Sequence, residues 1–288
     1  MPAQSTTKAA ESAATRLREL SADLMKVAGE IGESMSSKDA HRLRTSIRRI
    51  EVAMEAGEKV GGTKKLQSRL DKLRRAAGHV RDIDVQTDLL LGMDAGDYSG
   101  DCSALKNALL RSREKFEKKA VSQVLKAVSN DLEGRLEKAA AAIEQAGTLK
   151  QATSKDRVEK IREQYVEFTT EVPLDGDPLH DLRKAAKRLR YRLEAIPGRE
   201  SRALEKEMKV VQDLIGDWHD WATLTEQAEK RLEARSIAFV AFLRSRSIAK
   251  RHEARHAIQA LRLKLARAQS GKKRPSRAVI SPGIHITA

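Results

Sequence analysis

The sequence predicts an all-α fold in which a helical unit of about 140 residues occurs twice. Ala, Leu, Glu, Lys and Arg, which favour helices, dominate the composition. Apolar residues recur at intervals of three and four, whereas Gly and Pro fall between the periodic stretches. Two short motifs also recur at nearly the same offset, and this third observation indicates an internal duplication.

The first half of the chain carries the pattern of several successive helices. Ser36 and Asp39 resemble a capping box, which satisfies free backbone N–H groups at the start of a helix. Gly61 and Gly62 break the chain, and residues 92–100 are predicted to form a loop. The expected helical stretches are, in order, an amphipathic helix over 17–31, a second that opens at Ser36, a third marked by 66–73, and one long stretch over 102–147 with a kink near Gly134.

The second half begins near Ser154. Asp177 and Pro178 form a helix start signal, because Asp caps the first turn and Pro is compatible with its first position. The expected helices are, in order, one from 154 that stops before Pro173, one from Asp177–Pro178 to Pro197–Gly198, one over 201–218, and a long helical region over 220–268.

These patterns divide the chain into two repeats with a tail at each end. The C-terminal tail has Pro, Gly and basic residues without a helical period, so we expect it to be flexible. The expected segments are a flexible N-terminus over 1–11, a first helical-bundle repeat over 12–150, a second over 151–268, and a flexible basic tail over 269–288.

Two motifs support the duplication. The pattern H-x-L-R occurs at 41–44 (HRLR) and again at 180–183 (HDLR). The pattern G-x-x-[RH]-D occurs at 78–82 (GHVRD) and again at 216–220 (GDWHD). The two offsets differ by a single position, and two separate matches at nearly one offset are not expected by chance. The Asp that ends each second motif is expected to orient basic side chains.

The duplicated helix separates an apolar stripe from a row of cations at about 100° per residue. The apolar stripes consist of Leu43, Ile47, Ile50 and Met54 in the first copy and of Leu182, Ala186, Leu189 and Leu193 in the second. The basic rows consist of His41, Arg44 and Arg48 in the first copy and of His180, Arg183, Lys187 and Arg190 in the second. Like charges four residues apart cost roughly 0.2–0.5 kcal/mol per pair. Two interpretations of these rows are open. They are either solvated basic faces beside a core or binding sites for an anion that lies along them.

The overall composition favours an anionic partner. The formal net charge is +15, which suits nucleic acid, an anionic membrane or another polyanion. Aromatic residues make up only 3% of the chain, which counts against single-strand nucleic-acid binding by base stacking. A single Cys excludes an intrachain disulfide and a Cys-based zinc site. Because no secretory signal and no membrane-spanning apolar run is found, we expect a cytoplasmic location.

The double motif resembles the CHAD domain, the conserved histidine α-helical domain. The pattern H-x-L-R-x-x-x-[RK]-R-[LI] occurs twice, and each copy is followed by a helix that is expected to end in G-x-x-[RH]-D. The resemblance extends over about residues 12–268. It implies two pseudo-symmetric four-helix bundles with a basic central groove. It also implies binding of long-chain inorganic polyphosphate and, in some bacteria, association with polyphosphate granules.

The resemblance, together with the basic rows, gives a set of expected polyphosphate-binding residues. Glu51 departs from the pattern because it occupies the repeat position of Arg190, so the second half is expected to bind more tightly. The expected binding residues are His41, Arg42, Arg44, Arg48, Arg49, Arg81, His180, Arg183, Lys187, Arg188, Arg190, His219 and Arg255.

Two further motifs resemble catalytic signatures but lack the required context. Residues 252–256 (HEARH) match the zincin pattern, yet no Asp or Glu follows to serve as a third zinc ligand. Residues 205–209 (EKEMK) match the E-x-E-x-K pattern of triphosphate tunnel metalloenzymes, but they lie within a helical period rather than on a strand. We therefore expect no catalysis, metal or cofactor. Nucleic-acid binding and enzymatic turnover of polyphosphate remain the alternatives.

Overall fold

The computed structural model describes residues 3–55, 63–94, 96–145, 153–171, 179–233 and 236–272, and the regular structure within these ranges is entirely helical. This agrees with the predicted all-α fold. The helices are α1 (Ala3–Glu30), α2 (Ser37–Glu55), α3 (Lys64–Leu91), the short 3₁₀ helix η1 (Gly96–Tyr98), α4 (Ser99–Ser129), α5 (Leu132–Gln145), α6 (Ser154–Glu171), α7 (Leu179–Glu194), α8 (Arg199–Arg231) and α9 (Ile237–Lys272).

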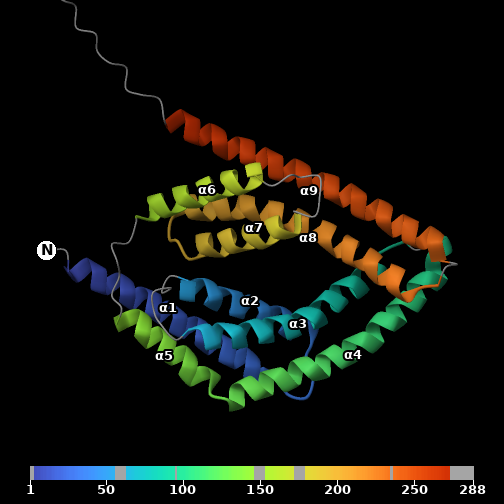
Figure 1. Cartoon of the computed structure of the whole chain (residues 1–288), viewed down its shortest axis with the longest axis horizontal. Coiled ribbons are helices and arrows are strands. Elements are labelled where there is room, and N and C mark those ends of the chain that lie inside the picture. Colours follow the sequence, from blue (N-terminus) through green and yellow to red (C-terminus); the bar gives the residue numbers. More distant parts are fainter. Residues whose placement is uncertain are drawn as a thin grey trace, which may run out of the picture.

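The helices form two halves that lie one above the other in Figure 1. In the lower half α1 packs against α2 and α5, α2 packs against α3, and α3 runs along α4. In the upper half α7 packs against α8, α8 runs along α9, and α6 contacts both α7 and α9. The halves meet where α2 packs against α7 and where α3 packs against α8.

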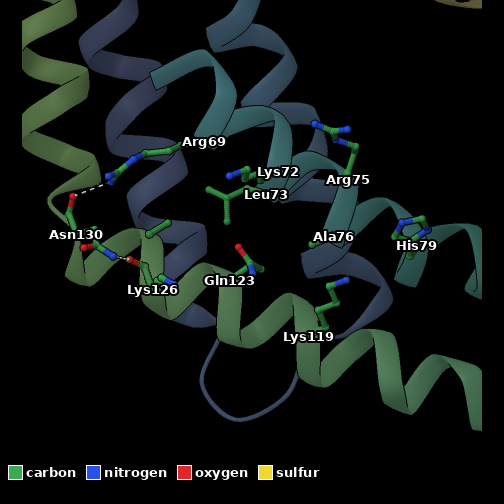
Figure 2. A pocket seen from close by; sticks show the side chains of 11 residues that line it. Arg69, Lys72, Leu73, Arg75, Ala76, His79, Lys119, Gln123, Lys126 and Asn130 are labelled. Atoms are coloured by element: carbon green, nitrogen blue, oxygen red, sulfur yellow. Dashed lines mark hydrogen bonds between the residues drawn. The ribbon is translucent and has the colours of Figure 1, made fainter. Parts of the chain in front are cut away.

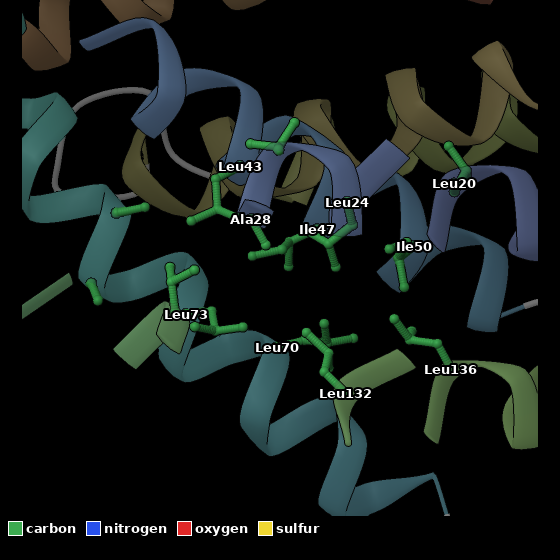
Figure 3. Close-up of a cluster of buried hydrophobic side chains, with 14 of the residues drawn as sticks. Leu20, Leu24, Ala28, Leu43, Ile47, Ile50, Leu70, Leu73, Leu132 and Leu136 are labelled. Carbon is green, nitrogen blue, oxygen red and sulfur yellow. The ribbon is translucent and has the colours of Figure 1, made fainter. Parts of the chain in front are cut away.

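The core of the first half is built from the apolar faces of α1 to α5 (Figure 3). The apolar stripe predicted on α2 is confirmed, because Leu43, Ile47, Ile50 and Met54 are each at most 3% exposed. The capping box is also confirmed. The N–H of Asp39 donates to Ser36 Oγ at 3.1 Å, and the N–H of Ser36 donates to Asp39 Oδ2 at 3.1 Å.

A second core lies between α6, α7, α8 and α9. The stripe predicted on α7 is buried here, with Leu182, Leu189 and Leu193 inside the cluster and Ala186 at 2% exposure. Tyr165 of α6 packs in the same cluster. Each basic helix therefore uses its apolar stripe to pack within its own half, which leaves its other faces available to the opposite half.

A third core joins the two halves where α3 and α4 meet α8 and α9, at the end of the molecule where these helices converge in Figure 1. Its buried members are Ile83, Leu90, Cys102, Leu105, Leu109, Leu224, Ala228, Phe239 and Leu243. Because this cluster draws on both halves, the two halves share apolar contacts in addition to their own cores.

The ends of the first half differ from the sequence-based boundaries. α1 begins at Ala3, so the backbone of 3–11 is helical where a flexible segment was expected. Its Ala-rich sequence without Gly favours this outcome. The helix break expected near Gly134 falls at Asp131, whose φ is +58°. Asp tolerates this left-handed conformation, and its Oδ1 accepts the N–H of Gly134 at 3.1 Å, which caps α5.

The helix end expected at Trp218 is also wrong. α8 continues through Gly216 and Trp218 to Arg231, and α9 begins at Ile237. The third core explains this, since it buries Leu224 on the continued part of α8. α9 extends to Lys272, beyond the expected boundary at 268, and the tail from 273 lies outside the described residues. None of the described helices is long and apolar enough to cross a membrane.

Candidate functional site

The basic faces of α2 and α7 meet at the interface between the two halves. Four cations lie there, Arg44 and Arg48 on α2 and Arg183 and Lys187 on α7, and they are called the cation row below. The charges of Arg44, Arg48 and Arg183 each act on Lys187, so residues from both halves share one electrostatic environment. The structure thus brings together the two rows that the sequence predicted.

Arg44 is held in place by α3. Its Nη1 lies 2.8 Å from Asp82 Oδ1 and donates to the carbonyl of Gly78 at 3.2 Å. A side chain at position 78 would contact this guanidinium, because an ideal Cβ there lies 3.7 Å from Arg44 Cζ. That distance is an ordinary van der Waals contact, so a small side chain at position 78 would fit beside Arg44 without displacing it. Asp82 orients a basic side chain, as its position in the motif predicted.

The other three members of the cation row have no acidic partner within ion-pair distance among the described residues. Burial is the main reason that the pKa of Lys187 falls from 10.5 to about 6. The neighbouring positive charges of the row act in the same direction, and Asp220 opposes them. Burial also lowers the pKa values of Arg48 and Arg183, although both guanidinium groups remain charged at neutral pH. The interface thus concentrates positive charge in a poorly hydrated place.

His41 and His180 stand at the start of the two rows. Burial lowers the pKa of His41, and the nearby charges of Arg81, Arg44 and Lys187 act in the same direction. Burial also lowers the pKa of His180. Both imidazoles are therefore neutral at pH 7, with one ring nitrogen that donates a hydrogen bond and one that accepts.

The residues of the second motif lie beside these histidines. The ring of His219 stacks on His180 with centroids 5.6 Å apart, and its Nδ1 lies 3.2 Å from Thr223 Oγ1. Arg81, at the equivalent place in the first half, donates to Ser37 Oγ at 2.7 Å. These contacts bring Arg81 and His219 to the same end of the site as the two motif histidines.

Arg190 lies in an internal network rather than in the cation row. Its Nε donates to Gln212 at 2.9 Å, and its Nη1 lies 3.2 Å from Glu205 and 3.8 Å from Glu194. Its guanidinium also lies 4.4 Å from the ring centroid of Tyr191. With its side chain only 14% exposed, Arg190 connects α7 to α8.

Glu51 makes the corresponding connection in the first half. Its carboxylate lies 3.1 Å from Nε of Arg74 on α3. Arg74 and Gln212 are separated by the same offset as the two copies of the second motif, so they occupy equivalent positions. The pair Glu51–Arg74 in one half thus corresponds to Arg190–Gln212 in the other. The difference between Glu51 and Arg190 is therefore a difference between two internal contacts.

Reciprocal ion pairs connect α2 and α7 beyond the cation row. Arg49 of α2 lies 2.7 Å from Glu194 of α7, and Arg188 of α7 lies 3.3 Å from Glu55 of α2. Arg192 adds a second pair to Glu55 at 2.8 Å. The sequence analysis did not predict that Glu55 and Glu194 would pair across the halves. The two acids are nevertheless separated by the same offset as the two H-x-L-R motifs. Arg49 and Arg188 therefore hold the halves together.

Two of the expected binding residues lie elsewhere. Arg42 pairs with Glu30 at the end of α1. Arg255 lies on α9, which packs along α6 and α8. His252 and the neighbouring Glu253 of the HEARH segment are exposed on that same helix. The structure does not place these α9 residues on the helices that form the cation row.

Comparison with known families agrees with this architecture. A family model described as the CHAD domain matches residues 16–229, most of the chain. The chain belongs to the CHAD domain family. The crystal structure of the CHAD domain from the plant Ricinus communis superposes with a TM-score of 0.72 at 19% identity, and the match covers 89% of this chain and 91% of that one.

A second solved structure of similar fold is PptA from Streptomyces chartreusis. It superposes on this CHAD protein with a TM-score of 0.63 at 16% identity, and the match covers 88% of this chain and 98% of that one. At such identities the likeness shows the fold alone. No curated protein sequence matches this chain.

The EKEMK segment of this CHAD protein lies on α8, as predicted from its helical period. Its first, third and fifth side chains each have an ion-pair partner. Glu205 pairs with Arg190, Glu207 lies 2.8 Å from Lys264, and Lys209 lies 2.6 Å from Asp213. The segment therefore contributes to packing of the second half rather than to a barrel of the tunnel type.

Proposed function

We propose that this CHAD domain binds long-chain inorganic polyphosphate along the cation row and does not turn it over. One observation carries the proposal: Arg48, Arg183 and Lys187, contributed by both halves, share an interface without acidic ion-pair partners in the described ranges. Such crowding of cations is unfavourable in the free protein. A ligand with closely spaced negative charges would reverse that cost.

Polyphosphate fits these residues better than nucleic acid does. It is a flexible chain of phosphates without bases, so it needs dense cations and no aromatic platforms. The protein has 56 Lys and Arg but only 3% aromatic residues. Arg48 and Arg183 can each engage two phosphate oxygens, whereas Lys187 acts as a point charge. The neutral His41 and His180 can add hydrogen bonds to phosphate oxygens.

Binding rather than turnover suits the state of Asp82, an acid beside the cation row. The carboxylate of Asp82 is engaged by the guanidinium of Arg44, so its charge already has a partner inside the protein. Release of phosphate by the pure protein with Mg²⁺ or Mn²⁺ would contradict this part of the proposal. Association with polyphosphate granules would follow from binding of long chains.

The test is a pull-down on polyphosphate-coated beads over a salt series. The variant Arg48→Gln, Arg183→Gln and Lys187→Gln should lose most binding, and its plot of log K against log salt should be shallower by about two. The matched control replaces Lys155, Lys160 and Lys206 with Gln, which removes the same number of basic residues from exposed positions of the second half. Normal binding by the row variant, once shown to be folded, would disprove the assignment.

Competition separates the proposal from nucleic-acid binding. At equal phosphate concentration, duplex DNA should fail to displace long-chain polyphosphate from the wild-type protein. Displacement by DNA at that concentration would favour a general nucleic-acid-binding role for the same residues. Both titrations need one stated salt concentration, since binding to either polyanion falls steeply with salt.

A further inference from the structure

A second basic site lies in the first half, between α3 and α4. A pocket of about 560 Å³ opens there, and Figure 2 shows side chains from both helices around it. Its lining contains no Asp or Glu. The basic residues of the lining are Arg69, Lys72, Arg75 and His79 from α3 and Lys119 and Lys126 from α4. We call this the α3–α4 pocket.

Most of the charge in the α3–α4 pocket lacks an acidic partner. Lys72, Lys119 and Lys126 are exposed, and none forms an ion pair within the part of the chain that the structure describes. Arg69 is fixed by donation from its Nη1 to the carbonyl of Asn130 at 3.1 Å, a contact that leaves its charge uncompensated (Figure 2). Arg75 pairs with Asp71 and is the exception.

The α3–α4 pocket and the cation row lie on different sides of α3. Leu73 and Ala76 line the pocket, whereas Gly78 contacts Arg44 of the cation row. At about 100° per residue, Gly78 lies roughly opposite to Leu73 and Ala76 around the helix. A phosphate group held in the pocket therefore cannot touch the cation row at the same time.

The lining determines which anions fit. The uncharged part of the lining includes the small or apolar residues Leu73 and Ala76, and Gln123 and Asn130 add neutral polar groups. The one ring in the lining, His79, is already stacked on Phe116 with centroids 4.8 Å apart. The lining therefore offers a nucleotide base no aromatic platform. The chemistry matches a short run of phosphates without a base.

We propose that the α3–α4 pocket is a second binding site for inorganic phosphate chains, which makes the protein bivalent. This inference rests on the proposed function, because the cation row is taken as the first binding site and holds one stretch of polyphosphate. The second stretch, from the same long chain or another, occupies the pocket. Two sites on one rigid protein raise the affinity for long chains beyond that of either site alone.

The test is a calorimetric titration with tripolyphosphate, which is too short to reach both sites, at low salt. The wild-type protein should bind two equivalents. The variant Lys72→Gln, Lys119→Gln and Lys126→Gln should bind one, and the control with Lys155, Lys160 and Lys206 replaced should keep two. All these lysines are exposed, so the replacements should leave stability almost unchanged.

The outcomes separate this inference from the proposed function. If the pocket variant still binds two equivalents with wild-type affinity, or if wild-type binding is a single equivalent that this variant retains, the α3–α4 pocket is not a site. If the pocket variant loses one equivalent while the row variant loses none, the pocket is supported and the cation row is not. Loss of one equivalent in each variant supports both.

Discussion

Arg49 on α2 and Glu194 on α7 form an ion pair at 2.7 Å that crosses between the two halves. A reciprocal pair joins Arg188 and Glu55, which are separated from Arg49 and Glu194 by the same offset as the two H-x-L-R motifs. In this joint α2 contributes Arg49 and Glu55, and α7 contributes Glu194 together with Arg188 and Arg192. Under the proposed function, the ligand contacts the cations that lack such partners.

The first prediction concerns this joint. Arg49→Glu places two carboxylates together and should reduce the free energy of unfolding by about 1 kcal/mol. Adding Glu194→Gln removes the repulsion and should recover about half of that loss. Urea unfolding followed by circular dichroism measures both changes. The control is the single variant Glu194→Gln. If the loss of unfolding free energy in the double variant equals the sum of the losses in the two single variants, the two residues do not interact.

The second prediction concerns proton uptake by Lys187. With a pKa of about 6 in the free protein, this amine is mostly neutral at pH 7.5. A bound phosphate chain favours the charged form, so binding should take up a proton and strengthen as the pH falls from about 8 to about 6. Calorimetry in buffers of different ionisation enthalpy counts the protons taken up.

Lys187→Met is the matched variant for this experiment, because its side chain cannot take up a proton. Proton uptake at pH 7.5 should fall by nearly one relative to wild type. His41 and His180 contribute only at lower pH, since burial lowers their pKa values below 6.5. The same uptake in the Met variant would mean that Lys187 is already charged before the ligand arrives.

The third prediction separates Arg190 from the binding residues. Arg190→Met leaves Glu205 without its guanidinium partner and removes the contact with Gln212. The free energy of unfolding should fall by about 2 kcal/mol. Affinity of the folded protein for long-chain polyphosphate should change less than twofold. A large loss of affinity with unchanged stability would return Arg190 to the site.

The fourth prediction uses Cys102, the single cysteine, as a reporter on the third core. Cys102 is 8% exposed and burial raises the pKa of its thiol, so alkylation at pH 8 should be at least about tenfold slower than in the unfolded chain. Reactivity should rise with urea along the global unfolding curve. Rapid labelling without urea would show that the third core opens separately.

The sequence was sufficient to predict features that depend on local periodicity. The stripe from Leu43 to Met54 and the cation positions beside it follow from one helix, and the structure places both as expected. The equivalence of the two motifs also predicted that Asp82 would orient a basic side chain. These inferences needed only residue spacing, which is fixed once the segment is helical.

What the sequence could not give is the partner of each charge. Arg190 and Arg183 lie on one predicted face, yet only Arg190 meets Glu205 of the neighbouring helix. That difference depends on how α7 packs against α8. The continuation of α8 past Trp218 likewise depends on the third core, whose members lie far apart in the chain. The α3–α4 pocket was missed because it needs two helices placed side by side.

The joints on either side of the cation row have a consequence for binding energy. One joint is the third core, which packs just beyond Arg81 and His219, and the other is the set of ion pairs at Glu55 and Glu194. Between them α2 and α7 are preorganised, so a ligand loses little free energy in bringing the halves together. Salt screens the ion pairs at Glu55 and Glu194 and so weakens that joint, whereas the apolar contacts of the third core are not screened. Raising the ionic strength should therefore loosen the site from its Glu55 end.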